Sequence, residues 1–359
     1  AVILAVVLVL PAAAFAMLPE ANARSSTGMD GPTVSEKIVD YDTSNHWKYW
    51  AGGYDGKETT TQNVGRIWTD KTVKKTGEGE KSDFLTTLSA ISSTSDTTIS
   101  GKPLDIVLVL DASGSMDDEM SRSDRTKRID ALKTAANGFI DTIATQNQGI
   151  AESKQHKVAI VKFSGDKTGE VGNKTYRKDG FTYNYSQTMM GLTNCSETSA
   201  TDLKKTINKI NPAGSTRADY GLQLADEVFS SGRADAKKVV VFFTDGSPTS
   251  SSGFENEVAD SAINSAKSIK AKGADIYTIG IFSGANPSDY PTVEGTSNEN
   301  KFMHAVSSNY PGASSSIINE GRHKTWTINF GARAENANYY KAATSATELE
   351  KIFEEISGS

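Results

Sequence analysis

The stretch "VLVLDASGSM", residues 107–116, changes abruptly from an aliphatic run to a polar cluster. The run from Ile106 to Leu110 is typical of a strand that is buried on both faces, as in a parallel sheet. Asp111, Ser113 and Ser115 follow it and would lie on the loop at the carboxyl end of that strand. Ligands of open α/β sheets bind at this end. The sequence therefore predicts a binding loop at residues 111–116.

Helical and strand-like segments alternate from residue 103 onward, which predicts an α/β fold with a mainly parallel sheet. Strands are expected at 104–110, 156–164, 237–244 and 274–282, with a shorter one near 184–192. Helices are expected at about 128–145, 200–210, 255–272 and 345–356. The last helix carries its apolar residues at helical spacing, so one of its faces should enter the core. These residues are Leu349, Ile352, Phe353 and Ile356.

Two further loops offer the same chemistry as the first. One contains Ser215 and Thr216 before a helix, and the other contains Thr244 and Asp245 after the aliphatic strand 237–244. If that strand is a parallel neighbour of 104–110, their loops emerge at the same edge of the sheet. Carboxylate and hydroxyl oxygens without His or Cys suit Mg²⁺, with Ca²⁺ or Mn²⁺ as alternatives, rather than zinc. An open position on such an ion would accept a carboxylate from another molecule.

The motifs "DASGSM", "AGSTRADYGL" and "FFTDG" together resemble the metal-ion-dependent adhesion site (MIDAS) of von Willebrand factor A (VWA) domains. The resemblance covers about residues 103–357 and implies a doubly wound, Rossmann-like sheet flanked by helices. It implies Ser113, Ser115 and Thr216 as direct metal ligands. Asp111 and Asp245 would bind the metal directly or through water. All five ligand positions match in type and order.

An acidic run, Asp117, Asp118 and Glu119, follows the first motif. In integrin-like relatives an acidic pair at about this distance supports a second, regulatory cation, which would here involve Asp118 and Glu119. The alternative, a solvated acidic loop, is favoured, because runs of like charge are usually exposed to water.

A narrower resemblance links the chain to Gram-positive surface and pilus-tip adhesins, in which the A domain is inserted within a β-sandwich. It rests on "GRIWTDKTV" at residues 65–73 and on expected insertions at about 165–182 and 284–325. Polar loops of that length are often functional, so the insertions would build or decorate a specificity surface, with disordered segments as the alternative. In such adhesins a sandwich lysine can form an intramolecular isopeptide bond with an Asn. Lys71 is the candidate here, with an exposed strand lysine as the alternative.

The residues before 103 divide into three segments. Residues 1–23 resemble an export signal that lacks its beginning, with an aliphatic stretch and A-x-A cleavage sites ending at Ala16 and Ala23. A membrane anchor is the less favoured alternative. Residues 24–62 are polar, and 63–102 contain two β-branched stretches, 64–73 and 84–100, that predict strands. They indicate an incomplete all-β segment of an immunoglobulin-like sandwich before the VWA region.

Charge and cysteine content restrict the function. The net charge of −6 argues against nucleic-acid binding, which needs a basic surface. Cys195 is the only cysteine, so no intrachain disulfide exists, and we expect an unremarkable thiol in a surface segment. A serine nucleophile needs a base beside it, and no His lies on the three loops, which argues against an enzyme.

The sequence therefore favours a module exported to the surface or cell wall of a Gram-positive bacterium. It would bind, through its metal, a carboxylate of an extracellular-matrix or other cell-surface protein. The alternative is a structural pilus or surface-assembly subunit, in which the metal stabilises the fold or a contact with other pilus subunits.

Overall fold

The computed structural model describes residues 4–10, 67–76, 83–92, 102–320 and 323–358. The chain divides into two compact units, Ala1–Gly101 and Lys102–Ser359. The second unit contains the motifs of interest.

The second unit is built on a six-stranded sheet in the order β13-β10-β9-β4-β5-β8. Every neighbouring pair is parallel except β5 and β8, which are antiparallel. The mainly parallel sheet predicted from the sequence is thus confirmed. The strands are β4 (Leu104–Asp111), β5 (Lys157–Phe163), β8 (Gln187–Asn194), β9 (Lys237–Thr244), β10 (Asp275–Gly280) and β13 (Tyr340–Ala342).

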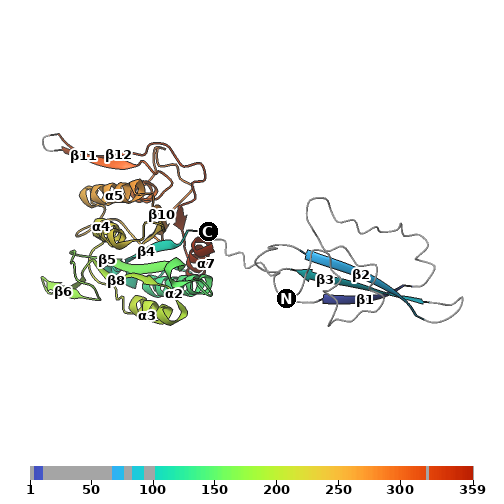
Figure 1. The fold of residues 1–359 in the computed structure, drawn as a ribbon. Coiled ribbons are helices and arrows are strands. Elements are labelled where there is room, and N and C mark those ends of the chain that lie inside the picture. Colours follow the sequence, from blue (N-terminus) through green and yellow to red (C-terminus); the bar gives the residue numbers. More distant parts are fainter. Residues whose placement is uncertain (1–3, 11–66, 77–82, 93–101, 321–322, 359) are drawn as a thin grey trace. The chain divides into compact units, whose positions relative to one another are not determined.

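Helices cover both faces of this sheet, as Figure 1 shows. Alternate residues of β4 enter two different cores, because successive side chains of a strand point to opposite faces. Ile106, Leu108 and Leu110 pack with α2, α3 and α7 on one face. Val107 and Val109 pack with α4, α5 and α6 on the other. The helices are α2 (Arg128–Gln146), α3 (Glu197–Asn208), α4 (Ala218–Val228), α5 (Asn256–Ala271), α6 (Asn298–Val306) and α7 (Ala346–Gly358).

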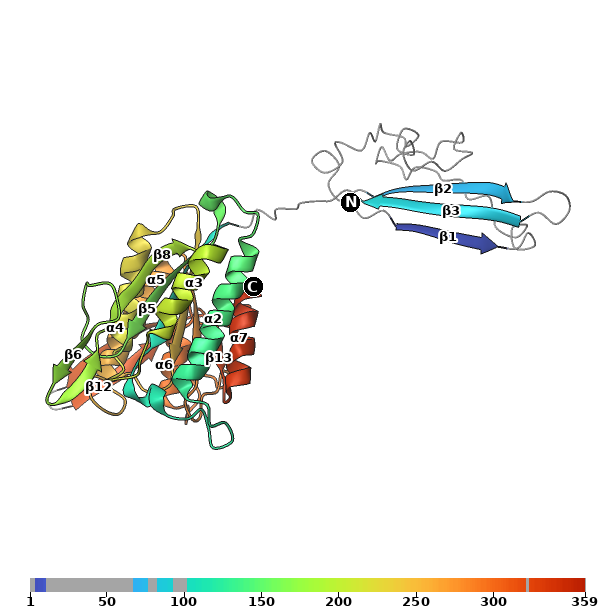
Figure 2. The same cartoon turned by 90° about the horizontal axis from the view of Figure 1, so that it is seen from below.

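The last helix, α7, lies beside α2 (Figure 2). Leu349, Phe353 and Ile356 are buried and Ile352 is partly buried against the same core, which confirms the predicted apolar face. The ring of Phe353 meets that of Phe139 on α2 edge to face, with centroids 6.0 Å apart. This aromatic contact joins the end of the unit to its first helix.

The segment 284–325 differs from the expectation of a polar insertion at the surface. It contains α6, whose Phe302, Met303 and Val306 are almost fully buried against the sheet. The sequence pattern does not predict this helix, because it is only nine residues long and interrupted by polar residues. The hairpin β11 (Ser314–Glu320) and β12 (His323–Asn329) follows it and lies along α5 (Figure 1).

Cys195 lies in the core between the sheet and α2, fully buried, and its thiol donates to the Ile140 carbonyl oxygen. The expectation of a surface segment is therefore wrong. Burial raises the pKa of the thiol to about 12, so it stays protonated and unreactive at neutral pH. Its flanking residues Asn194 and Ser196 are polar, and this pattern hides the inward-facing position.

His304 on α6 is fully buried, and its Nδ1 accepts from the Asn309 side-chain amide at 3.2 Å. Its Nε2 has no hydrogen-bond partner among the described residues. Burial, helped by the positive charge of Arg333 and opposed by Asp289, lowers the pKa of His304 to about 4. The imidazole is therefore neutral in the folded protein at pH 7.

Acid should destabilise the fold through His304, because the unfolded chain takes up this proton near pH 6.5 and the folded one only near pH 4. The contribution of the neutral His304 to the free energy of unfolding is present above pH 6.5 and is lost as the pH falls from 6.5 to 4. At pH 5 the loss is about 2 kcal/mol. Urea unfolding at pH 7 and pH 5 measures this loss. His304→Gln, which cannot be protonated, should lose about 2 kcal/mol less than the wild type between these two pH values. Equal losses in both proteins would contradict the assignment.

The first unit contains a three-stranded antiparallel sheet in the order β1-β3-β2. Strands β2 (Ile67–Thr76) and β3 (Asp83–Ser92) overlap the two predicted stretches, 64–73 and 84–100. Leu4–Leu10 forms β1 and pairs with β3, although the sequence analysis assigns these residues to an export signal. Their β-branched valines favour pairing of this kind. The signal, the domain boundaries and the sandwich stay predictions.

Lys71 lies in β2 opposite Leu88. Its side chain lies outside the described residues, so the isopeptide bond also stays a prediction.

Candidate metal centre

Asp111 and Asp245 lie at the same edge of the sheet, as the sequence predicts. Asp111 is the last residue of β4, and Asp245 comes directly after β9. The two strands are parallel neighbours with Leu110 opposite Phe243, so their carboxyl ends coincide. The short 3₁₀ helix η3 (Gly114–Asp117) begins three residues after β4 and carries Ser115. Strand pairing thus brings the first and third motifs together.

Hydrogen bonds connect four of the five predicted ligands. The Asp111 carboxylate accepts the Ser113 N–H at 2.8 Å and the Thr244 hydroxyl at 2.7 Å. Ser115 donates its hydroxyl to Asp245 Oδ1 at 2.9 Å, and the Ser113 and Ser115 hydroxyl oxygens are 3.1 Å apart. The two serine hydroxyls and Asp245 Oδ1 therefore form one hydrogen-bonded cluster, and the Asp111 carboxylate is joined to it through the Ser113 backbone.

The loop that carries Thr216 is attached to the first loop by its backbone. Ala213 N–H donates to the Ala112 carbonyl, and Gly114 N–H donates to the Gly214 carbonyl, both at 3.0 Å. Gly214 has φ +96°, and a Cβ there would come within 2.8 Å of Tyr183, so this position requires glycine. Thr216 is buried, but the described hydrogen bonds do not connect its side chain with the other four ligands.

Two carboxylates in a dry site carry an electrostatic cost. Asp111 is fully buried and Asp245 is 3% exposed. Burial, and then the negative charge of Asp245, raise the pKa of Asp111 well above its ordinary value. A divalent cation would remove this cost, and the hydroxyls of Ser113 and Ser115 would supply further hard oxygens. The residues therefore fit Mg²⁺ or a similar ion, and Thr216 would add a third hydroxyl.

Among the described residues, no three His, Cys, Asp or Glu side chains form a group that could hold a metal. The candidate site has two carboxylates and completes its donor set with hydroxyls. All of these donors are oxygens, which are the ligands that hard divalent cations prefer.

Arg128 is a member of the site that the sequence analysis misses. It is the first residue of α2, and its Nη1 donates to Asp245 Oδ2 at 2.8 Å and to the Ser115 carbonyl at 3.4 Å. The two oxygens of Asp245 thus have different partners, since Oδ1 faces the serine hydroxyls and Oδ2 faces Arg128. The contact joins residues 117 positions apart, and no local pattern indicates it.

Each residue of the acidic run lies near a cation of the same chain. Asp117 and Glu119 form short ion pairs, and Asp118 lies 3.9 Å from Arg128 Nη1. The pairs are Asp117–Lys127 at 2.8 Å and Glu119–Arg125 at 2.6 Å. These side chains are largely exposed and contribute little to stability. A second cation at Asp118 and Glu119 stays a prediction.

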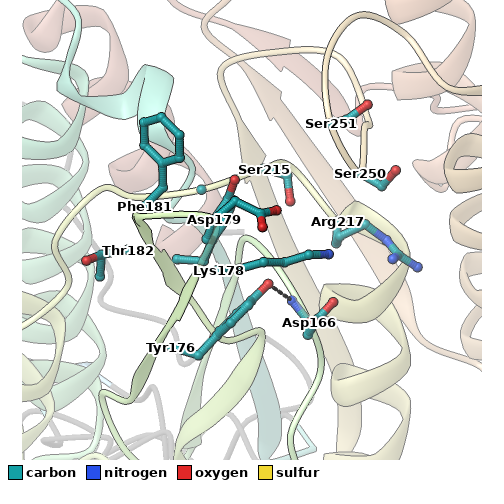
Figure 3. Close-up of a pocket in the computed structure, with 12 residues that line it drawn as sticks. Asp166, Tyr176, Lys178, Asp179, Phe181, Thr182, Ser215, Arg217, Ser250 and Ser251 are labelled. Atoms are coloured by element: carbon teal, nitrogen blue, oxygen red, sulfur yellow. Dashed lines mark hydrogen bonds between the residues drawn. The ribbon is translucent and has the colours of Figure 1, made fainter.

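A pocket of about 650 Å³ lies beside the loop of Thr216 (Figure 3). Gly214, Ser215 and Arg217 line one side of it. A hairpin lines another side; it consists of β6 (Thr175–Lys178) and β7 (Phe181–Asn184). This hairpin lies mostly within the expected insertion 165–182. Lys178 and Asp179 of this hairpin line the same pocket as Arg217 (Figure 3).

The hairpin is attached to the sheet through Lys162 on β5. This lysine is fully buried, and its Nζ donates to the side-chain oxygens of Asn173 and Asn184 at 2.8 and 2.9 Å. Burial lowers its pKa to about 8. These contacts hold the insertion in place beside the candidate site.

The family of the chain follows from this fold and these motifs. The family model of the von Willebrand factor type A domain matches residues 105–315, and the chain belongs to that family. No curated protein matches the sequence.

Solved structures with a similar fold include two pilus proteins. The pilus adhesin SpaC of Lactobacillus rhamnosus GG is 17% identical with a TM-score of 0.50; the match covers 92% of this chain and 40% of SpaC. The minor pilin PilB of Streptococcus sanguinis is 15% identical, with a TM-score of 0.47 and coverage of 80% and 66%. This chain therefore spans well under half the length of SpaC.

A third structure is the proximal thread matrix protein 1 of the mussel byssus, which has a zinc-occupied MIDAS motif. It is 18% identical with a TM-score of 0.42, and the match covers 72% of this chain and 46% of that protein.

Among the described helices of the present chain, none has the length and apolar character needed to cross a membrane.

Proposed function

We propose that this chain is a cell-surface adhesin module that binds a protein partner through a divalent cation. The observation that carries the proposal is the meeting of two buried carboxylates and two serine hydroxyls at one edge of the sheet. Asp111, Ser113, Ser115, Thr216 and Asp245 would hold the ion. When bound, it would act as a Lewis acid toward an oxygen ligand of the partner.

Mg²⁺ is the ion we favour, with Ca²⁺ or Mn²⁺ as alternatives. Mg²⁺ requires six oxygens and usually keeps several waters, so a site of few protein ligands leaves a position for exchange. A carboxylate of the partner would take that position. The pocket between the β6–β7 hairpin and the Thr216 loop would contact the residues that flank this carboxylate.

The surface of a Gram-positive bacterium is the proposed location. The names of SpaC, a pilus adhesin, and of PilB, a minor pilin, favour this location, while the structural likeness concerns the fold alone. The partner would be an extracellular-matrix or other cell-surface protein, and nucleic acid is disfavoured by the net charge of −6. The alternative is a structural pilus subunit whose metal stabilises a contact with other subunits.

An enzymatic role is disfavoured by the surroundings of the two serines. The Ser113 and Ser115 hydroxyls hydrogen-bond to each other and to the Asp245 carboxylate. An ionised Asp beside a cation is a weak base for a serine nucleophile.

Removal of the metal tests the proposal. Mg²⁺ should give saturable calorimetric binding to the full chain, and immobilised collagen, fibronectin or fibrinogen should capture the loaded protein. Chelation with EDTA should abolish capture, and Mg²⁺ in excess should restore it.

Capture that persists in EDTA would contradict the adhesin proposal. Saturable Mg²⁺ binding without capture of any of the three proteins would favour the structural alternative. The absence of metal binding would contradict both.

A further inference from the structure

Arg128 places a fixed positive charge against the candidate metal centre. Its side chain is 19% exposed and pairs with Asp245, whose side chain is 0% exposed, at 2.8 Å. The Nε of Arg128 is buried and has no hydrogen-bond partner among the described residues. Such burial of a guanidinium carries a cost, which the contact with Asp245 offsets.

The position of Arg128 in its helix does not explain this arrangement. As the first residue of α2 it lies at the positive end of the helix dipole, where a cation is unfavourable. Arg125, three residues earlier, instead pairs with Glu119 at the surface, with 74% of its side chain exposed. Arg128 also lies 3.9 Å from the exposed Asp118, but its close contact is with the buried Asp245 of the site.

We propose that Arg128 is a built-in counter-charge that lowers the affinity of the site for the divalent cation and raises the affinity of the loaded site for an anionic partner. The inference rests on the proposed function. In the form that binds a cation, with both aspartates ionised, Arg128 leaves the ligand set one net negative charge instead of two. A bound divalent cation then leaves one net positive charge, which a carboxylate of the partner neutralises.

The proposal predicts opposite changes in two affinities. Arg128→Gln keeps a polar side chain of similar reach but removes the charge. The Mg²⁺ dissociation constant should fall about tenfold, because a unit positive charge that contacts the proposed ligand Asp245 is removed. At saturating Mg²⁺, the acetate concentration that gives half of the maximal Tm shift should rise severalfold, because the loaded site is no longer positive.

A third measurement does not need the metal. In EDTA, Arg128→Gln should lower the Tm, because two buried carboxylates then share the site without a counter-charge. Arg125→Gln is the matched control and should change neither affinity nor the metal-free Tm. Arg128→Lys keeps the charge and should retain the low Mg²⁺ affinity of the wild type.

The outcomes separate the inference from the proposed function. If the wild type binds Mg²⁺ and Arg128→Gln binds it equally or more weakly, the counter-charge is wrong and the proposed metal centre stands. Tighter Mg²⁺ binding with weaker acetate binding supports the inference. If neither protein binds Mg²⁺, the metal centre fails and the inference fails with it. Binding by the variant alone shows that Arg128 blocks the ion, which supports the inference and contradicts the proposed function.

Discussion

Replacing Asp111 by Asn should remove Mg²⁺ binding and leave the metal-free protein at least as stable as the wild type. Asn keeps the size of the side chain and an acceptor oxygen for the Ser113 N–H, and its amide group can donate to the Thr244 hydroxyl, which in the wild type donates to the carboxylate. It removes a fully buried charge that lies close to Asp245. The loss of a charged ligand should weaken Mg²⁺ binding more than about 100-fold. This exceeds the effect of substituting a residue that only supports a metal ligand, which is about 10- to 100-fold.

Calorimetry and thermal unfolding together measure this result. At a concentration of 100 times its dissociation constant, Mg²⁺ should stabilise the wild type by about 2.7 kcal/mol. The Asn variant should show none of this stabilisation. Asp117→Asn is a control in the same loop, since Asp117 is exposed and pairs with Lys127. An Asp111→Asn variant that binds Mg²⁺ like the wild type would contradict the proposed site.

Truncation of Phe353 to Ala should lower the free energy of unfolding by about 3–5 kcal/mol. The ring is fully buried and packs edge to face on Phe139, so its removal leaves a cavity between α7 and α2. Few single changes outside the site should cost more. The lost contact is the principal aromatic one between these two helices.

Urea unfolding of Phe353→Ala beside Glu350→Ala measures the cost. Glu350 is exposed on the same helix, and its truncation should change the stability by less than about 0.5 kcal/mol. The slope of the transition should stay unchanged, because both variants retain the fold. Similar midpoints for the two variants would show that α7 is not held through Phe353.

Much of the site could be predicted because its two carboxylates come directly at the carboxyl ends of aliphatic strands. Asp111 and Asp245 follow β4 and β9 directly, and parallel pairing of these strands is enough to bring them together. The loop of Thr216 needed the motif as well, because its attachment runs through backbone hydrogen bonds of Gly114 and Gly214. Backbone hydrogen bonds depend little on side-chain identity, so the amino-acid composition of these loops hardly indicates them.

The features that escaped prediction depend on contacts distant in sequence. The local sequence does not distinguish Arg128 from other polar residues, and it joins the site because α2 places it beside Asp245. Cys195 looks exposed between two polar neighbours, but it packs below α2. Helix α6 is short, and its burial against the sheet compensates for a weak helical pattern. In each case tertiary packing decides what local sequence leaves open.

The ends of the second unit lie together, away from the candidate site. Leu104, which begins β4, and Ile356, near the end of α7, line the same small pocket, whereas Asp111 ends β4 at the opposite edge. A partner held at that edge would pull against the chain along the axis of β4. The hydrogen bonds of β4 with β5 and β9 lie across this axis, so tension would load them in shear and together rather than one after another.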